Sequence, residues 1–145
     1  MLKKINLVIS SRIDNLDENG FAEGECEVSE SSLSGTMKIS SEELSLSYHE
    51  NTDGEDVFCE IRPTSDSVTV RRTGAIVSIL YFSESEDYET VYEIPPYKFD
   101  MTIKTKKIRN TLTELGGTLE IHYLMSVGGA SKRAKMKISV SEASK

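Results

Sequence analysis

Apolar and polar residues alternate along most of this chain, and a period of two is typical of β-strands with one buried face. The first alternating segment covers residues 5–13, and the clearest pair covers 119–127 and 134–140 on either side of Gly128 and Gly129. Two long strands joined across a Gly-Gly pair predict a β-hairpin. Helical periodicity is nearly absent, and residues 108–115 have room for one helical turn at most.

Further short strands, separated by turns, are predicted between these ends. The residues expected on their buried faces are Cys26 and Val28; Met37 and Ile39; Leu44, Leu46 and Tyr48; Val57, Cys59 and Ile61; Val68 and Val70; Val77, Ile79 and Tyr81; Tyr88, Thr90, Tyr92 and Ile94; and Phe99, Met101 and Ile103. A turn is expected at 41–43. The serine-rich stretch 29–34 is expected to be mobile.

These segments predict an all-β fold. About ten strands follow one another too closely for crossover helices, so the sheet should be antiparallel. One buried and one wet face suit either a sandwich or a barrel. Long consecutive strands with short turns favour an up-and-down β-barrel of about 8–10 strands, because a barrel also removes exposed sheet edges. Residues 1–145 are expected to form this barrel as a single domain.

Charge is unevenly distributed along the chain, whose formal net charge is −7. Residues 17–66 hold 14 acidic and 2 basic residues, whereas residues 98–145 hold 10 basic and 4 acidic residues. The basic half could form a face for an anionic partner, and Lys104, Lys106, Lys107 and Arg109 are its densest run. We favour the interpretation that acidic and basic strands simply lie near one another in the barrel wall, because no nucleic-acid-binding motif accompanies the basic run. No nucleic-acid partner is therefore expected.

The two cysteines, Cys26 and Cys59, have neither a disulfide-framework nor a zinc-site spacing. Both lie in apolar alternation and are expected to be small buried hydrophobes. The N-terminal residues alternate like a strand and no small-residue cleavage site follows them, so no signal peptide is predicted. No apolar run approaches the length of a membrane span. A cytoplasmic location without membrane attachment is the resulting expectation.

No catalytic residue, metal site or cofactor is predicted. His49 and His122, the two histidines, alternate out of phase with the apolar residues and are expected to face solvent. Neither has a second ligand at metal-site spacing or a nucleophile arranged as in a catalytic triad. We therefore do not expect an enzyme. One using Glu50 as an acid or base is the least favoured function.

Two charged residues share the faces of apolar ones. Glu50 continues the alternation of Leu44, Leu46 and Tyr48, and Arg72 continues that of Val68 and Val70. Buried charges must be paired, because burying an isolated charge is costly. The favoured interpretation is a Glu50–Arg72 ion pair near the hydroxyls of Tyr48 and Tyr92. Alternatively, Arg72 offers its guanidinium to a ligand carboxylate or phosphate, or both charges lie past the barrel rim in solvent.

Short motifs give a resemblance to a known family. They read Leu46-Ser-Tyr48-His-Glu50, then Val70-Arg-Arg72-Thr-Gly74, then Tyr92-Glu-Ile-Pro95-Pro-Tyr-Lys-Phe99-Asp-Met101, then Gly117-Thr-Leu-Glu-Ile-His-Tyr123. Over roughly residues 3–141 the chain resembles the YwiB-like family of small uncharacterised bacterial proteins. The resemblance implies a lipocalin-like, or calycin, β-barrel and no known activity. The chain departs from the family pattern in having Lys98, where a glycine is expected, and it has no tryptophan for a lipocalin signature.

The expected function is non-catalytic binding of a small amphipathic or anionic ligand in the barrel interior or mouth. The residues expected to bind it are Tyr48, Glu50, Arg72, Tyr92 and Tyr123. The alternative is a solid-core barrel that acts as a protein-interaction or homodimerisation module.

Overall fold

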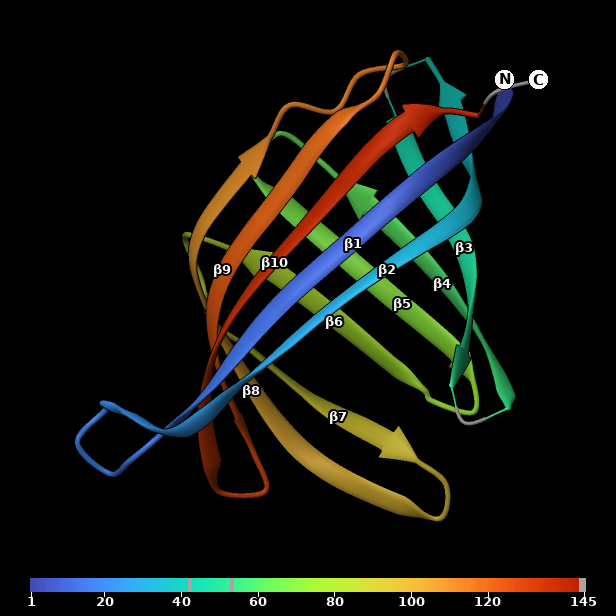
Figure 1. Cartoon of the computed structure of the whole chain (residues 1–145). Helices are drawn as coiled ribbons and strands as arrows, with labels where there is room; N and C mark the ends of the chain where they lie inside the picture. Colours follow the sequence, from blue (N-terminus) through green and yellow to red (C-terminus); the bar gives the residue numbers. More distant parts are fainter. Residues whose placement is uncertain (42, 53, 144–145) are drawn as a thin grey trace.

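The computed structural model describes residues 1–41, 43–52 and 54–143. They form ten strands: β1 (Leu2–Leu16), β2 (Ala22–Ser40), β3 (Glu43–Thr52), β4 (Glu55–Pro63), β5 (Ser67–Gly74), β6 (Ser78–Ser83), β7 (Tyr88–Ile94), β8 (Tyr97–Asn110), β9 (Gly117–Val127) and β10 (Ala130–Glu142). All ten belong to one antiparallel sheet in the order β6-β5-β4-β3-β2-β1-β10-β9-β8-β7 (Figure 1). The predicted all-β, up-and-down topology is confirmed. No helix with the length and apolar character of a membrane span occurs in the described residues.

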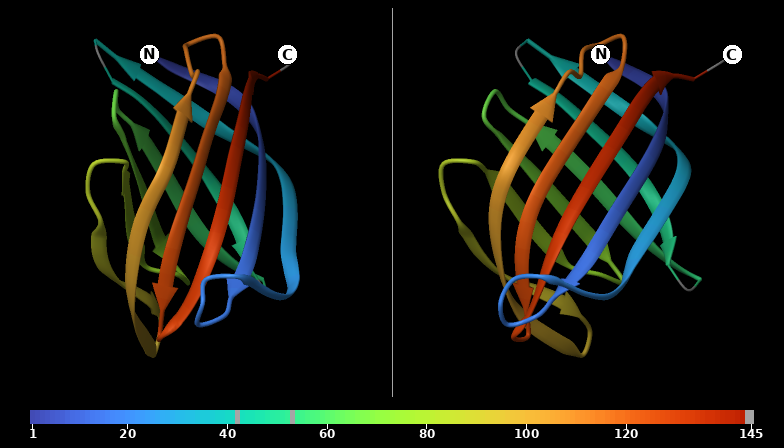
Figure 2. Two further views of the ribbon diagram at one scale, coloured as in Figure 1. Left: turned by 90° about the vertical axis from the view of Figure 1, so that its left-hand side faces the viewer. Right: turned by 60° about the vertical axis from the view of Figure 1, so that its left-hand side comes forward.

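The sheet curls into a nearly closed barrel whose seam lies between β6 and β7 (Figures 1 and 2). Val77 and Glu93 exchange two backbone hydrogen bonds across the seam, at 2.8 and 3.0 Å. The backbone N–H of Ser83 also donates to Oγ1 of Thr105 at 3.1 Å. The strands that carry the chain ends, β1 and β10, are instead paired along most of their length.

The apolar core fills the end of the barrel near the two termini. Its largest completely buried side chains come from strands all around the wall: Phe82, Ile5, Leu7, Met37, Leu46, Ile61, Ile103, Leu119, Ile121, Ile138, Val57 and Val68. Burying one such side chain contributes about 1.5–3 kcal/mol, so this core is the main source of stability. The alternation that predicted an inward face for most of these residues is therefore confirmed.

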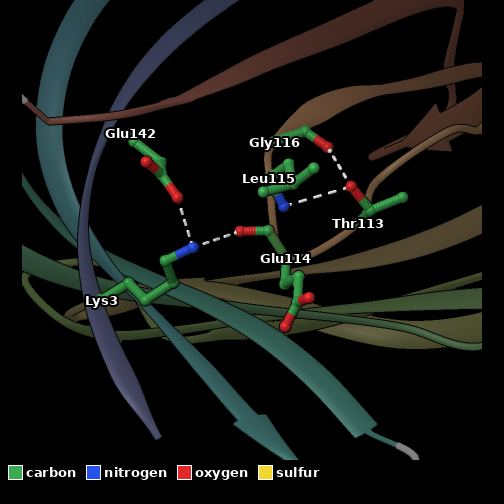
Figure 3. Close-up of polar contacts among 6 residues, drawn as sticks. All are labelled: Lys3, Thr113, Glu114, Leu115, Gly116 and Glu142. Atoms are coloured by element: carbon green, nitrogen blue, oxygen red, sulfur yellow. Dashed lines mark hydrogen bonds and ion pairs between the residues drawn. The ribbon is translucent and has the colours of Figure 1, made fainter.

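A polar cluster ties together the chain ends and the loop between β8 and β9 (Figure 3). The Lys3 ammonium group pairs with the Glu142 carboxylate and donates to the Glu114 carbonyl at 2.7 Å. Within the loop, the Leu115 N–H donates to Oγ1 of Thr113 at 3.1 Å. These contacts hold the loop beside β1 and β10 at the closed end of the barrel.

The predicted turns fall between the observed strands. Gly128 and Gly129 join β9 to β10 with φ angles of 57° and 87°, and two consecutive positive φ values are those of a tight hairpin turn. Of the predicted turn at 41–43, residue 41 follows β2 as a turn, residue 42 is outside the described residues, and residue 43 begins β3.

The prediction for β2 is wrong in one respect, and residues 29–34, expected to be mobile, belong to one continuous strand. Cys26 and Val28 are exposed rather than buried. The reason is that the first part of β2 extends with the end of β1 beyond the barrel, where no opposite wall covers it (Figure 1). Cys59 is buried, as predicted.

The predicted face of β6 is also wrong. Ser78, Leu80 and Phe82 are buried, whereas Val77 and Ile79 are about 40% exposed. Apolar residues occupy both faces of this short strand, so alternation alone could not decide between them.

Candidate functional site

A partly enclosed cavity of about 580 Å³ occupies the barrel end opposite the termini. All ten strands contribute lining residues. The lining is mainly apolar and includes Met101, Met125 and Met136, whose unbranched side chains adapt readily to different shapes. Pockets of roughly 300–1,000 Å³ are typical for small molecules, so the cavity can hold a ligand of modest size.

Arg72 lies in a transverse row of residues that face the interior. Cross-strand pairing places Gly35 of β2 beside Tyr48 of β3, Tyr48 beside Cys59 of β4, Cys59 beside Arg72 of β5, and Arg72 beside Ser78 of β6. Directly opposite side chains in an antiparallel pair lie about 4.5–5.5 Å apart at Cβ. The row therefore positions a guanidinium between a thiol and a hydroxyl on the barrel wall.

Polar atoms of Arg72 and Ser78 have unused hydrogen-bonding capacity. Nε of Arg72 and Oγ of Ser78 are inaccessible to solvent and have no hydrogen-bond partner among the described residues. An unsatisfied buried donor costs about 1–3 kcal/mol, and more when the group is charged. Since the two residues are directly paired across β5 and β6, the unused capacity is concentrated at one place on the barrel wall, beside the cavity that Arg72 lines.

Arg72 nevertheless remains a cation. Burial opposes the charged form, but the neighbouring acidic groups, Glu50 above all, favour it more strongly, so the pKa of Arg72 is raised above its usual value. The favoured prediction of a Glu50–Arg72 ion pair is wrong, since the described residues contain no such pair within 4.0 Å. Both side chains are half-buried, which also excludes the alternative of two solvated charges beyond the rim.

The Tyr48 and Tyr123 hydroxyls and the Cys59 thiol are held in their neutral forms. Burial is the main cause of the raised pKa of Tyr48, and Cys59 and Glu50 add to it. Burial also raises the pKa of Cys59 to about 11. The pKa of Tyr123 is raised by burial, against the opposing effect of Arg72, and its ring packs on Phe82 at 4.7 Å between centroids. Neutral hydroxyls can donate hydrogen bonds to a bound anion.

All five predicted ligand-binding residues line this one cavity: Tyr48, Glu50, Arg72, Tyr92 and Tyr123. Their roles in binding remain predictions. Sequence reasoning missed the buried Ser78 beside Arg72, because it assigned the wrong face to β6. It also missed Asn51 and Lys132, which line the cavity. Lys132 is two residues before Ala134 and four before Met136, so the alternation along β10 places it on the same inward face. This pattern could have identified Lys132 from the sequence.

The two histidines lie on the outer wall, away from the cavity. His49 is exposed and its Nδ1 lies 2.9 Å from Asp56. His122 lies 2.6 Å from Glu120, and this hydrogen bond is the main reason that the pKa of Glu120 is lowered. In the part of the chain that the structure describes, no three His, Cys, Asp or Glu side chains are grouped so as to hold a metal ion.

Comparisons with known proteins agree with this fold. No curated protein matches the chain. The crystal structure of the ywiB protein from Bacillus subtilis is similar to it, with a TM-score of 0.85 over 99% of this chain and 94% of that chain. The two sequences are 24% identical, so the likeness concerns the fold. A family model described as "Domain of unknown function (DUF1934)" matches residues 15–140. This match and the likeness in fold together confirm the resemblance to YwiB-like proteins. The chain therefore belongs to the family that this model describes.

Proposed function

We propose that this barrel is a non-catalytic binding protein for a small amphipathic molecule with one anionic group. The anionic group lies against Arg72, and the apolar part of the ligand fills the methionine-lined remainder of the cavity. The observation that carries the proposal is the solvent-inaccessible Nε of Arg72, which lacks a partner among the described residues beside a cavity of about 580 Å³.

A carboxylate or phosphate would satisfy Arg72 better than any other ligand group. The guanidinium presents parallel N–H donors that match these anions in a bidentate geometry. Such charge-assisted hydrogen bonds are roughly twice as strong as neutral ones. Tyr48, Tyr92 and Tyr123 line the same cavity, and their hydroxyls can donate further hydrogen bonds to the anion.

Glu50 supports a ligand with a single anionic group. Its carboxyl group lies in the same cavity and is near enough to raise the pKa of Arg72. A second anionic group on the ligand would be repelled by Glu50, and this repulsion is strong in a partly enclosed site. The solid-core alternative is less well supported, because the barrel interior contains the cavity.

Isothermal titration calorimetry tests the proposal with octanoate, dodecanoate, hexadecanoate and dodecyl phosphate as ligands. We expect saturable binding of at least one of them and weaker binding of dodecanol, which has the same chain as dodecanoate but no charge. Arg72→Gln should weaken binding by about tenfold or more, or about 1.4 kcal/mol. Arg71→Gln is the matched control, because Arg71 is the exposed neighbour on the other face of β5.

Three outcomes would contradict the proposal. The first is that no compound of the panel binds. The second is that dodecanol binds as tightly as dodecanoate. The third is that Arg71→Gln and Arg72→Gln lose the same affinity while both proteins remain folded by circular dichroism.

A further inference from the structure

The outer surface of the barrel carries a concentrated patch of positive charge, which we call the basic wall. It consists of Lys104, Lys106, Lys107 and Arg109 of β8 and of Lys135 and Lys137 of β10, all of them exposed. Lys107 and Lys135 both pair with His122 of β9, and Arg109 and Lys137 both pair with Glu120. Residues far apart in the sequence thus form adjacent rows on a protein whose net charge is −7.

A second surface carries the opposite charge. Residues 18–30, here called the acidic ribbon, form the tip of the β1–β2 hairpin, which projects from the barrel (Figure 1), and the start of β2. The last residues of the ribbon, 28–30, pair with β1 on the barrel wall. The ribbon holds Glu18, Glu23, Glu25, Glu27 and Glu30 and no lysine or arginine. Every residue in it is exposed, including Phe21 and Val28 at 71% each. A two-stranded ribbon without a packing partner is marginally stable.

Most of the charge on the two surfaces is not paired within one molecule, although the Glu120 carboxylate of β9 lies between Arg109 and Lys137. Among the described residues, Arg12 and Arg133 pair with Asp14, Lys3 pairs with Glu142, and Arg62 pairs with Glu60. The two remaining pairs join His49 to Asp56 and His122 to Glu120. None of these pairs uses a lysine or arginine of the basic wall or a glutamate of the acidic ribbon.

We propose that two copies of this chain associate, with the acidic ribbon of each copy lying on the basic wall of the other. This reciprocal contact gives a closed two-fold dimer. It brings six cations against five carboxylates at each of two equivalent places and covers Phe21 and Val28. The inference does not depend on ligand binding in the cavity.

A second copy fits the basic wall better than a nucleic acid does. The wall residues, and Glu120 and His122 of β9 between them, include no Phe, Tyr or Trp on which bases could stack, because Tyr123 of β9 faces the interior cavity. The remainder of the molecule is strongly acidic and would repel a polyanion. The chain itself supplies the complementary surface in its acidic ribbon.

A charge-swap experiment tests the dimer by sedimentation velocity over a range of protein concentrations. The wall variant combines Lys135→Glu with Lys137→Glu, and the ribbon variant combines Glu25→Lys with Glu27→Lys. We expect the unchanged protein to form a dimer that weakens at high salt, because exposed charges are screened over about 10 Å at 0.1 M salt. Each variant alone should associate about tenfold or more weakly.

The mixture of the two variants is the decisive sample. An equimolar mixture should form a heterodimer, because each reversed surface then meets a surface of opposite charge. The matched control combines Lys4→Glu with Lys38→Glu, which changes two exposed lysines outside the basic wall. This control should dimerise like the unchanged protein.

The dimer proposal fails if the unchanged protein is a monomer at every concentration. It fails equally if the folded variants stay monomeric when mixed, if assemblies larger than two copies form, or if a single-stranded oligonucleotide binds the wall while the protein remains monomeric.

Discussion

At the scale of single residues, Arg72 is kept inside the barrel by several groups rather than by one partner. Tyr48 and Cys59 belong to its transverse row, and Glu50 acts on it through charge without an ion pair. Alternation predicted that Glu50 and Arg72 would face inward, because the backbone geometry of a strand alone decides on which face each residue lies. It could not predict the missing ion pair, because the distance between two side chains depends on register and rotamers.

Cys59 should make the folded protein less stable in alkaline solution. Burial raises its pKa from a usual value near 9 to about 11. Above pH 9 the thiol therefore ionises in the unfolded chain while it stays protonated in the folded protein. The unfolded chain then binds fewer protons, so the free energy of unfolding falls as pH rises, by up to about 1.4 kcal/mol per pH unit.

Urea unfolding at several pH values from about 8 to about 10 checks this prediction. The fall in the free energy of unfolding should begin within this range, near the usual pKa of the thiol. Cys59→Ala should reduce the fall in stability, whereas Cys26→Ala should leave it unchanged, because Cys26 is exposed. Equal pH dependence of both variants would mean that Cys59 is not the group responsible.

At the scale of strands, the sequence predicted elements best where one face is apolar and the other polar. The hairpin β9–β10 has this pattern and was predicted with its turn and its inward face. The sequence failed at β6, where both faces are apolar. It also failed at the start of β2, where Cys26 and Val28 alternate as in a core strand but have no opposite wall. Local periodicity does not contain the information on what a strand faces.

Gly35 is a strand residue whose missing side chain brings β1, β2 and β3 together. A Cβ atom there would lie 2.4 Å from the Ser47 carbonyl oxygen, 2.7 Å from Cδ1 of Leu7 and 3.2 Å from Cβ of Tyr48. Gly35→Ala should therefore lower the free energy of unfolding by about 1–3 kcal/mol, although glycine is otherwise the less favourable strand residue. Urea unfolding measures this, with exposed Ser34→Ala as the control. Equal stability of the two variants would show that β2 can move away from β3.

At the scale of the whole molecule, the barrel is filled at one end and hollow at the other. Strand order and closure could be predicted, because successive antiparallel strands with short turns have few alternative arrangements. The cavity could not be predicted, because its volume depends on how side chains from all ten strands fill the space. Hydrophobic periodicity also could not predict that the seam lies between β6 and β7 rather than between the strands at the chain ends.

A disulfide across the seam should stabilise the barrel. Val77 and Glu93 exchange both backbone hydrogen bonds, and residues in such a pair have Cα atoms about 5.5 Å apart, within the range that a disulfide spans. Val77→Cys with Glu93→Cys, in a Cys26→Ser background, should therefore oxidise readily. Closing a loop of this length contributes up to about 3 kcal/mol. Urea unfolding with and without reductant compares the oxidised and reduced forms of the same variant. The effect of the substitutions on stability is the same in both forms and therefore cancels. If the disulfide does not form, or if the oxidised protein is no more stable than the reduced one, the two edge strands do not meet at this position in solution.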